Sequence, residues 1–352
     1  MERGNNFDGL RLAAATAVIF SHSFLLAEGR QDDEPLMRLT GGQSVLGVVG
    51  VFVFFVISGF LVTESWERTG APLRFAMKRF LRIYPGFAAC ILALALWLGP
   101  AVTTLAPGDY FRAGGLYEFV TQNLVMNVDH NALPGVRFTG HGVGDIVDGP
   151  LWSLPCEVLM YALVLVLGML RLLRLPVLVA LLALGLACVV TDTAASAYFI
   201  GAAGWLMPFF VAGMILQKLR ASPLLRDGRI ALLALAGLVL AAAAGRFILL
   251  FPVFGAYLVI YAALNPRWKP FPAARFGDLS YGLYIYGWPV EQTLLYVSQG
   301  RLAWWQLFPL ALAISAALAF ISWHLVEKPA LRLKPGAAPQ PRLAAPELRA
   351  SR

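Results

Sequence analysis

Long apolar segments, separated by shorter polar connections, run through most of the chain. They are roughly 17–25 residues long, the length at which an α-helix spans the hydrocarbon core of a membrane. The stretch 230–264 is apolar apart from Arg246, so we divide it there into a tight hairpin. The pattern predicts about ten transmembrane helices, over residues 8–27, 45–66, 79–99, 151–170, 176–191, 198–217, 230–245, 247–264, 279–297 and 304–326.

One further segment, 116–128, is expected to form a short re-entrant or amphipathic helix. Counting it as a span would invert every later loop and place the basic loops outside. The composition supports membrane insertion, because 59% of the residues are hydrophobic and only 14% are charged, whereas a soluble domain has about 25% charged residues. We therefore expect an all-α integral membrane protein, with one bundle over 1–334 and a disordered cytoplasmic tail over 335–352.

The net charge of +8 reflects topology and does not indicate a nucleic-acid partner. With a cytoplasmic N-terminus, all but six of the 28 Lys and Arg residues fall at or near the cytoplasmic side. This asymmetry is the positive-inside signal, and it predicts that both termini are cytoplasmic. The six exceptions are Arg30, Arg38, Arg112, Arg137, Arg246 and Arg301.

The longest connection between the predicted spans, 100–149, lies on the non-cytoplasmic side. A loop of this length is more often functional than idle, and we interpret it as a lid or an acceptor-binding surface. Its polar residues His130, His141, Asp145 and Asp148 lack the close spacing of a metal site, and the three cysteines of the chain show no paired spacing. No metal and no disulfide framework are therefore expected.

The first apolar segment carries polar residues where a membrane helix rarely has them. Asp8 and Arg11 are three positions apart and can pair at the cytoplasmic end. His22 follows Arg11 by eleven positions, which places both on one helix face about 16 Å apart along the axis. A neutral histidine, with a reference pKa of about 6.5, can act as a general base. The alternative is a packing histidine that hydrogen-bonds between helices.

Two further motifs lie in the second and third segments. Ser58 and Gly59 would let another helix or a ligand approach the backbone closely. Arg79 and Arg82 are one turn apart in the sequence KRFLRIYP, which also contains Tyr84. Arginine presents planar donors that suit phosphate groups. Positive-inside anchoring explains these arginines equally well when the motif stands alone.

The fourth motif opens the segment that begins near residue 151. It contains Trp152 and Ser153, then Glu157, with Tyr161 one turn later. A carboxylate within a span is energetically costly and needs a partner, so Glu157 is a candidate functional or site-organising residue. Trp152 also fits the aromatic belt at the membrane interface.

Together these motifs resemble the membrane-bound acyltransferase 3 family, whose members modify bacterial polysaccharides, lipopolysaccharides and nodulation factors. The resemblance extends over roughly residues 5–334 and rests on motifs in the same order, at 8–22, 54–61, 79–85, 152–161, 279–284 and 327–329. One departure concerns the motif after Tyr284: many members have a histidine there, whereas this chain has the sequence YGWP over 286–289.

The resemblance implies a membrane O-acyltransferase of the bacterial inner membrane. It would move an acyl group, acetyl on family grounds, from cytoplasmic acyl-CoA to a hydroxyl of an extracytoplasmic or lipid-linked carbohydrate. It implies that Arg79, Arg82 and Tyr84 contact acyl-CoA and that His22 is the general base or an acyl relay. Arg11 or a nearby donor would stabilise the developing charge. No tightly bound cofactor is implied, since acyl-CoA is a substrate.

A proton-coupled secondary transporter is the alternative from another class. An intramembrane histidine and an intramembrane glutamate, His22 and Glu157, also suit a proton relay. Many transporters carry an internal repeat, and no such repeat is evident in this sequence. A purely structural membrane subunit would leave His22, Arg82 and Glu157 unexplained.

Overall fold

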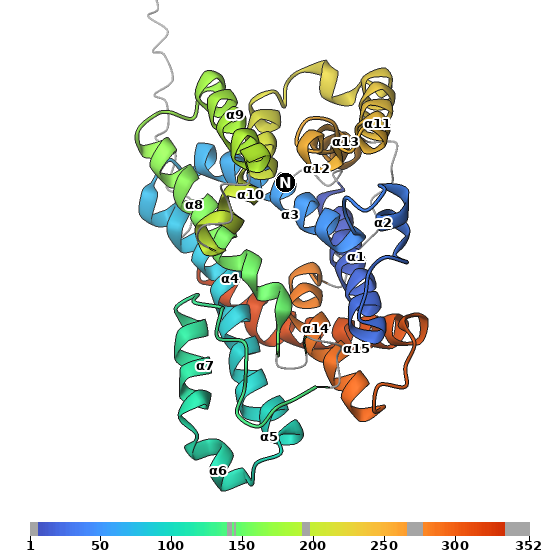
Figure 1. Cartoon of the computed structure of the whole chain (residues 1–352). Helices are drawn as coiled ribbons and strands as arrows, with labels where there is room; N and C mark the ends of the chain where they lie inside the picture. The colour runs from blue at the N-terminus through green and yellow to red at the C-terminus, as the bar shows by residue number, and fades with distance from the viewer. Residues whose placement is uncertain (1–5, 139–142, 144–145, 192–197, 266–276, 335–352) are drawn as a thin grey trace, which may run out of the picture.

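The computed structural model describes residues 6–138, 143, 146–191, 198–265 and 277–334, and within these residues every regular element is a helix (Figure 1). The α-helices are α1 (Phe7–Glu28), α2 (Pro35–Leu39), α3 (Leu46–Thr69), α4 (Pro72–Ala93), α5 (Gly99–Val102), α6 (Pro107–Arg112), α7 (Gly114–Leu124), α8 (Ser153–Met169), α9 (Leu175–Thr191), α10 (Tyr198–Lys218), α11 (Gly228–Ala243), α12 (Phe247–Leu250), α13 (Phe254–Leu264), α14 (Ser280–Val297), α15 (Trp304–Ser322) and α16 (Lys328–Arg332). The tail expected over 335–352, together with His141 and Asp145, lies outside the described residues.

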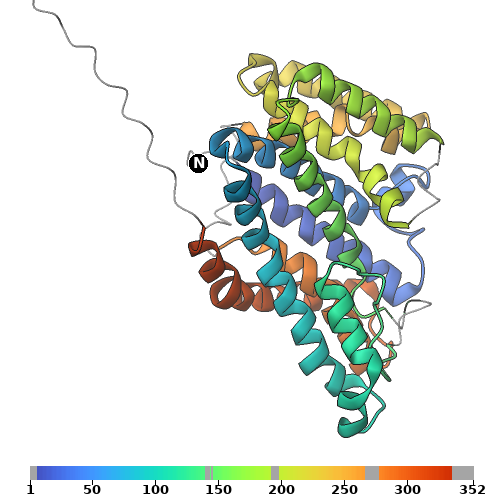
Figure 2. The ribbon, with the colours of Figure 1, turned by 90° about the vertical axis from the view of Figure 1, so that its left-hand side faces the viewer.

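Four short helical turns join or extend these helices. The π-helical turns are η1 (Leu94–Leu98) and η6 (Trp323–Glu327), and the 3-10 turns are η2 (Gly149–Trp152) and η4 (Pro223–Arg226). Because η1 continues α4 into α5, a single long helix carries the chain to α6 and α7, which extend beyond the rest of the bundle (Figure 2). The expected helix at 116–128 is represented by α7, which ends at Leu124.

All ten segments predicted to span the membrane fall on helices, and the segment 247–264 is interrupted between α12 and α13. By length and composition, five helices among the described residues can cross a bilayer: Phe7–Glu28, Leu46–Thr69, Pro72–Val102, Gly149–Met169 and Trp304–Arg332. This supports a multi-pass membrane protein, while ten crossings and cytoplasmic termini stay predictions. The shorter apolar helices are Leu175–Val190, Ala202–Lys218, Gly228–Ala243 and Phe254–Leu264.

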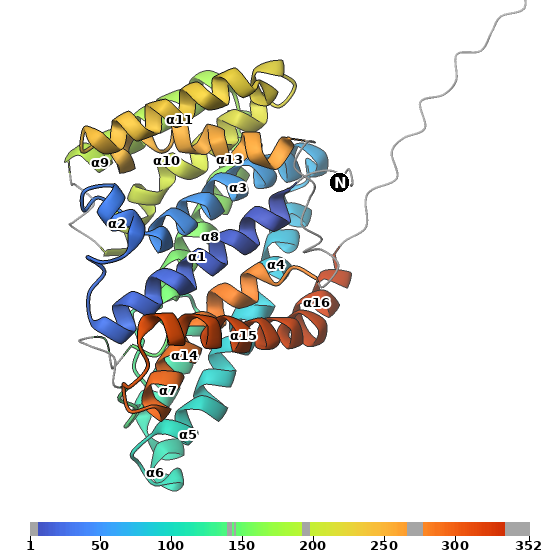
Figure 3. The same ribbon diagram turned by 90° about the vertical axis from the view of Figure 1, so that its right-hand side faces the viewer.

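The helix α3 lies at the centre of the bundle, between α1 and α10 (Figure 3). Its contact with α10 is so close that a Cβ atom on Gly59 would lie 2.0 Å from the carbonyl oxygen of Phe210. A Cβ on Gly213 of α10 would likewise lie 2.1 Å from the carbonyl oxygen of Val56. The expected role of Gly59 in close approach is therefore filled by a helix, since only glycine fits here.

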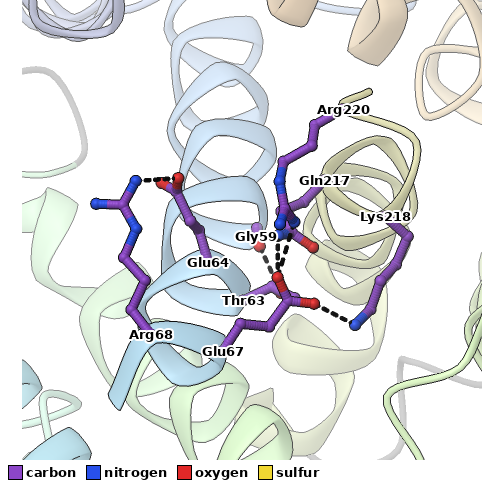
Figure 4. Close-up of polar contacts among 8 residues, drawn as sticks. All are labelled: Gly59, Thr63, Glu64, Glu67, Arg68, Gln217, Lys218 and Arg220. Atoms are coloured by element: carbon purple, nitrogen blue, oxygen red, sulfur yellow. Dashed lines mark hydrogen bonds and ion pairs between the residues drawn. The ribbon is translucent and has the colours of Figure 1, made fainter. Parts of the chain in front are cut away.

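A polar cluster fastens α3 to α10 near the end of α3 (Figure 4). The carboxylate of Glu67 accepts hydrogen bonds from Gln217 (2.6 Å), Arg220 (2.7 Å) and Lys218. Glu64 and Arg68 extend from the other side of α3, where they form an ion pair of 2.5 Å (Figure 4). The two sides of this helix end therefore have separate charge partners.

The first helix and the late helix α14 run side by side in the same direction. Arg11 pairs with Asp278, which immediately precedes α14, and His22 lies beside Glu291 near the far end of α14. Gly287 of α14 packs between them, because a Cβ there would contact Ile19 of α1 at 2.8 Å. The beginning of α1 and α16 also lie at the same end of the bundle (Figure 3).

Candidate functional site

A cavity of about 500 Å³ opens at the end of the bundle where α1 begins. Its walls come from α1, α3, α4, α8, the start of α14 and the end of the described chain. It brings together seven of the residues singled out in the sequence: Asp8, Arg11, Arg79, Arg82, Ser153, Glu157 and Tyr161. The first and last of these residues are more than 140 positions apart along the chain, so the fold gathers three separate motifs into one space.

One carboxylate, that of Asp278, is shared by two arginines in the cavity wall. Arg82 forms a hydrogen-bonded ion pair with it, and the Arg11 Nη1 atom lies 3.9 Å away. Ser280 donates a further hydrogen bond of 2.6 Å to Asp278. Burial alone would raise the pKa of Asp278, but Arg82 and Arg11 outweigh burial and lower it to about 2. The pairing expected between Asp8 and Arg11 is not formed among the described residues; Asp278 takes its place.

Arg79 has a different environment from Arg82. Its guanidinium donates a long hydrogen bond of 3.4 Å to Ser65, and its Cζ atom lies 5.7 Å from the ring centre of Tyr161. Its Nε atom is buried without a hydrogen-bond partner, and no ion pair is formed with any described carboxylate. Glu157 acts on Arg79 electrostatically but forms no ion pair with it, so the Nε–H group stays available to bind an anion.

Tyr84, the third residue expected at acyl-CoA, points away from the cavity. Its hydroxyl donates a hydrogen bond of 3.1 Å to the carbonyl oxygen of Leu124 in α7, and its ring stacks on Phe80 with centroids 4.7 Å apart. Tyr84 is absent from the described cavity wall. The residues of the motif around Arg79 therefore have different roles: the two arginines face the cavity, whereas Tyr84 contacts α7.

Glu157 is held in place by two hydroxyl groups. Ser58 of α3 donates a hydrogen bond of 2.8 Å to its carboxylate, and Tyr161 donates one of 2.5 Å from one turn further along α8. This explains the expected involvement of Ser58, which positions Glu157 without lining the cavity itself. The arrangement places the carboxylate near Arg79 and connects it with the cavity, apart from His22.

His22 lies in a second, buried polar cluster that does not line the cavity. Its Nδ1 atom is 3.9 Å from Oε2 of Glu291, and the edge of its ring meets Trp288 with centroids 4.9 Å apart. Glu291 is fully buried, and Ser23 donates a hydrogen bond of 2.6 Å to its other oxygen. Both Nδ1 of His22 and Oε2 of Glu291 lack a hydrogen-bond partner in the described chain.

The side chains of Ser153, Tyr284 and Phe54, which we call the partition, lie between the inner end of the cavity and this cluster. Ser153 and Tyr284 share a hydrogen bond of 2.6 Å, and Tyr284 also donates to the carbonyl oxygen of Pro150 at 3.0 Å. Phe54 packs edge-on against the Tyr284 ring, with centroids 5.6 Å apart. Trp288 follows Tyr284 by one turn on α14, so one helical turn separates the cavity wall from the residue that contacts His22.

The long connection 100–149 reaches the His22 cluster from the opposite side. Trp288 donates a hydrogen bond of 3.0 Å from Nε1 to the carbonyl oxygen of Ile146. Gln292 donates to the carbonyl oxygens of Val143 and Ile146 at 3.0 Å and 3.2 Å. The end of the loop is therefore attached to the helix that carries Glu291, and its expected role as a lid or an acceptor-binding surface stays a prediction.

Trp152 lies outside the cavity wall, on a smaller hollow formed with α10 and the turn 125–129. Its ring lies 6.4 Å from that of Trp205, measured between centroids. Among the described residues, no group of three or more His, Cys, Asp or Glu side chains could hold a metal ion, and Cys90, Cys156 and Cys188 are free thiols.

Sequence reasoning missed two important residues, Asp278 and Glu291. Glu291 falls inside the predicted span 279–297, and it carries the same signal that singled out His22, an ionisable side chain within an apolar segment. It could have been identified in that way. Asp278 lies just outside the same span, where an acidic residue is unremarkable, so its pairing with Arg11 and Arg82 becomes visible only in three dimensions.

A family model described as an acyltransferase domain matches residues 5–324. The chain belongs to this family, and it is an acyltransferase.

Two relatives are similar over nearly their whole length. An O-acetyl transferase of Shigella phage Sf6 is 25% identical over 337 residues, which cover 93% of this chain and 96% of the relative. Nodulation protein 10 of Rhizobium leguminosarum bv. viciae is 29% identical over 373 residues, covering 94% of each chain. No solved structure matches.

Proposed function

We propose that this protein is an acyl-CoA-dependent O-acyltransferase of the bacterial inner membrane. It transfers an acyl group, in the first instance acetyl, to a hydroxyl of a carbohydrate or glycolipid on the far side of the membrane. One observation carries the proposal: a single helix, α1, presents Arg11 to a basic cavity and His22 to a buried carboxylate about 16 Å further along. The relative from phage Sf6, which is named an O-acetyl transferase, supports the choice of acetyl.

The cavity is the binding site for the donor in this proposal. The nucleotide and its phosphates stay at the basic end, where Arg79 forms no ion pair with a described carboxylate and Asp278 fixes Arg82 in position. The narrow pantetheine arm then lies along the apolar inner part of the cavity and carries the thioester toward Ser153 and Tyr284. A displacement of the partition at Tyr284 brings the thioester to His22.

His22 is the general base in the chemical step. Its Nε2 atom takes the proton of the acceptor hydroxyl, and the hydroxyl oxygen forms a bond with the thioester carbonyl carbon. The carbon–sulfur bond breaks, and the proton passes from His22 to the leaving sulfur, so the products are an ester and free CoA thiol. A covalent acyl-histidine, formed first on His22 and then transferred to the acceptor, is the second route to the same products.

Glu291 positions His22 for either route. Its carboxylate faces Nδ1, so an Nδ1–H tautomer leaves Nε2 free to accept a proton, as in other histidine–carboxylate pairs. The separation of 3.9 Å is longer than a direct hydrogen bond, and catalytic hydrogen bonds in unliganded enzymes are often long. Ser23 fixes the other carboxylate oxygen and therefore the orientation of the pair.

Arg11 is assigned to donor binding and not to the stabilisation of charge at the reacting carbonyl. Its guanidinium lines the cavity and pairs with Asp278, while His22 lies three turns further along the same helix. A proton-coupled transporter is less well supported, because His22 and Glu157 lie in separate clusters and the chain belongs to an acyltransferase family.

The direct test is calorimetric titration of acetyl-CoA into the purified, detergent-solubilised protein, followed by measurement of free thiol release with a polysaccharide acceptor. Saturable binding and acceptor-dependent thiol release are expected. If the folded protein binds no acetyl-CoA, the assignment of acyl-CoA as the donor is refuted. If it binds acetyl-CoA but releases no thiol with any of a panel of bacterial polysaccharides, the assignment of a carbohydrate as the acceptor loses its support.

A further inference from the structure

The cations in the cavity wall fall into two groups. Arg11 and Arg82 share Asp278, and Arg68 pairs with Glu64. The other three, Lys78, Arg79 and Lys334, form no ion pair with a described carboxylate. The described wall holds six cations and four carboxylates, Asp8, Glu64, Glu157 and Asp278, so positive charge is in excess by two.

The three cations that form no ion pair come from two distant parts of the sequence. Lys78 and Arg79 lie on α4, whereas Lys334 follows α16 at the end of the described chain. Burial and the positive charges of Arg79, Arg82 and Lys78 lower the pKa of Lys334 to about 8. Gathering like charges in this way opposes folding, and an anionic ligand that binds between them removes the repulsion.

The cations also differ in where they point. Arg79 extends toward Tyr161 of α8, inside the bundle. Lys78 donates a hydrogen bond of 3.0 Å to Thr69, the last residue of α3, and therefore lies at the mouth of the cavity. Lys334 is half-buried beside Leu333, which is 73% exposed, so it also belongs to the mouth. The charges are thus arranged as one inner arginine and two outer lysines.

Building on the proposed function, we infer that Lys334 and Lys78 bind the phosphate monoester on the ribose of CoA, while Arg79 binds the diphosphate. The order follows from the shape of the donor, because the pantetheine arm begins at the diphosphate and leads inward. The monoester carries about two negative charges, which match two lysines. The diphosphate offers paired oxygens to the planar donors of arginine.

This assignment gives the cavity a specific selectivity. A donor without the ribose phosphate, such as an acyl-dephospho-CoA or an acyl-pantetheine, leaves Lys334 and Lys78 uncompensated and binds more weakly. The protein thereby distinguishes acyl-CoA from thioesters that carry the same arm and the same acyl group.

The test compares two probes, acetyl-CoA and acetyl-dephospho-CoA, by calorimetric titration of the purified full-length protein. The wild-type protein is expected to bind acetyl-CoA about tenfold more tightly, the effect of one or two charge-assisted contacts at a partly exposed site. Lys334→Met is expected to weaken acetyl-CoA binding severalfold and to leave acetyl-dephospho-CoA binding unchanged. Lys334→Arg should retain most of the discrimination.

Lys328→Met is the matched control, because Lys328 is exposed on α16 and lies outside the cavity wall. It should bind both probes as the wild type does. Equal affinity of the wild type for the two probes would overturn the inference while leaving the proposed function intact. An equal loss of affinity for both probes in Lys334→Met would also overturn the inference. If the folded wild type binds neither probe, the proposed function itself is refuted.

Discussion

The Nδ1 atom of His22 lies 3.9 Å from Oε2 of Glu291, and neither atom has a hydrogen-bond partner among the described residues. Glu291 is fully buried, so its position next to the histidine is not a chance surface contact. Buried polar atoms are nearly always paired. The unsatisfied pair therefore indicates a site prepared for a proton or a reacting group.

Replacing His22 by Ala should abolish acyl transfer without preventing donor binding. The loss of a general base lowers the rate about 10²- to 10⁴-fold, while the cavity that we propose as the acetyl-CoA site does not include His22. Free thiol release measures the first effect and calorimetric titration the second. An active His22→Ala variant would contradict both the direct and the relay mechanism.

Glu291→Gln should lower kcat about 10²-fold, because the base is left without its orienting carboxylate. The KM for acetyl-CoA should stay within about twofold, since Glu291 is remote from the cavity wall. The pH–rate profile distinguishes a positioning role of Glu291 from a merely structural one. If Glu291 positions His22, the limb of the profile that reports the ionisation of His22 should move to a different pH in the variant. An unchanged profile with a proportional loss of folded protein would show that Glu291 is merely structural.

Arg79→Gln should raise the dissociation constant for acetyl-CoA about tenfold or more, because the variant loses a buried cation that faces the ligand. Binding by the wild type should also weaken as ionic strength increases. The control is Arg74→Gln, one turn earlier on α4 and outside the cavity wall. If the two variants bind acetyl-CoA alike, positive-inside anchoring explains Arg79 better than phosphate binding.

Asp278→Asn should destabilise the protein by about 3 kcal/mol, because it leaves two arginines without their shared counter-ion. The wild-type pKa of about 2 lies below the ordinary 3.8, so the ionised carboxylate stabilises the fold above pH 3.8. That contribution is lost as the pH falls toward 2. The melting temperatures of wild type and variant should therefore differ by a constant amount near neutrality, and this difference should become smaller in acid.

Binding of acetyl-CoA should weaken as the pH rises above about 8, the pKa to which burial and the neighbouring cations lower Lys334. A bound phosphate favours the protonated lysine and raises its pKa, so the contact is fully present below pH 8 and is lost above it. Calorimetry from pH 6.5 to 9.5 checks this. Lys334→Met should flatten the dependence, provided that the enthalpy of buffer ionisation is corrected for.

Much of the fold could be predicted from the sequence because apolar periodicity is a local property. The segments 8–27, 45–66 and 304–326 all proved to be helices, since membrane-length apolar runs have few alternatives. The interruption between α12 and α13 was not predicted, because the segment 247–264 was assigned by hydropathy alone, although Pro252 beside Phe251 is a local helix-breaking signal. Local hydropathy contains no information on such a turn.

The candidate site was only partly accessible from the sequence. Arg79, Arg82, Glu157 and Tyr161 line one cavity, which the motifs taken singly did not indicate. The helix face shared by Arg11 and His22 suggested a single site, but 16 Å of helix separates them and the fold places them in different clusters. Partners such as Asp278 come from the far end of the chain, and no local pattern specifies which distant residue meets a given arginine.

The parallel contact of α1 and α14 has a consequence for how the protein is made. Arg11 is synthesised well before Asp278 and Glu291, which lie more than 260 positions further along the chain. Arg11 therefore gains its ion-pair partner Asp278 only when α14 packs beside α1. In the proposed mechanism, the donor site and the His22–Glu291 pair are both completed by this one late packing event.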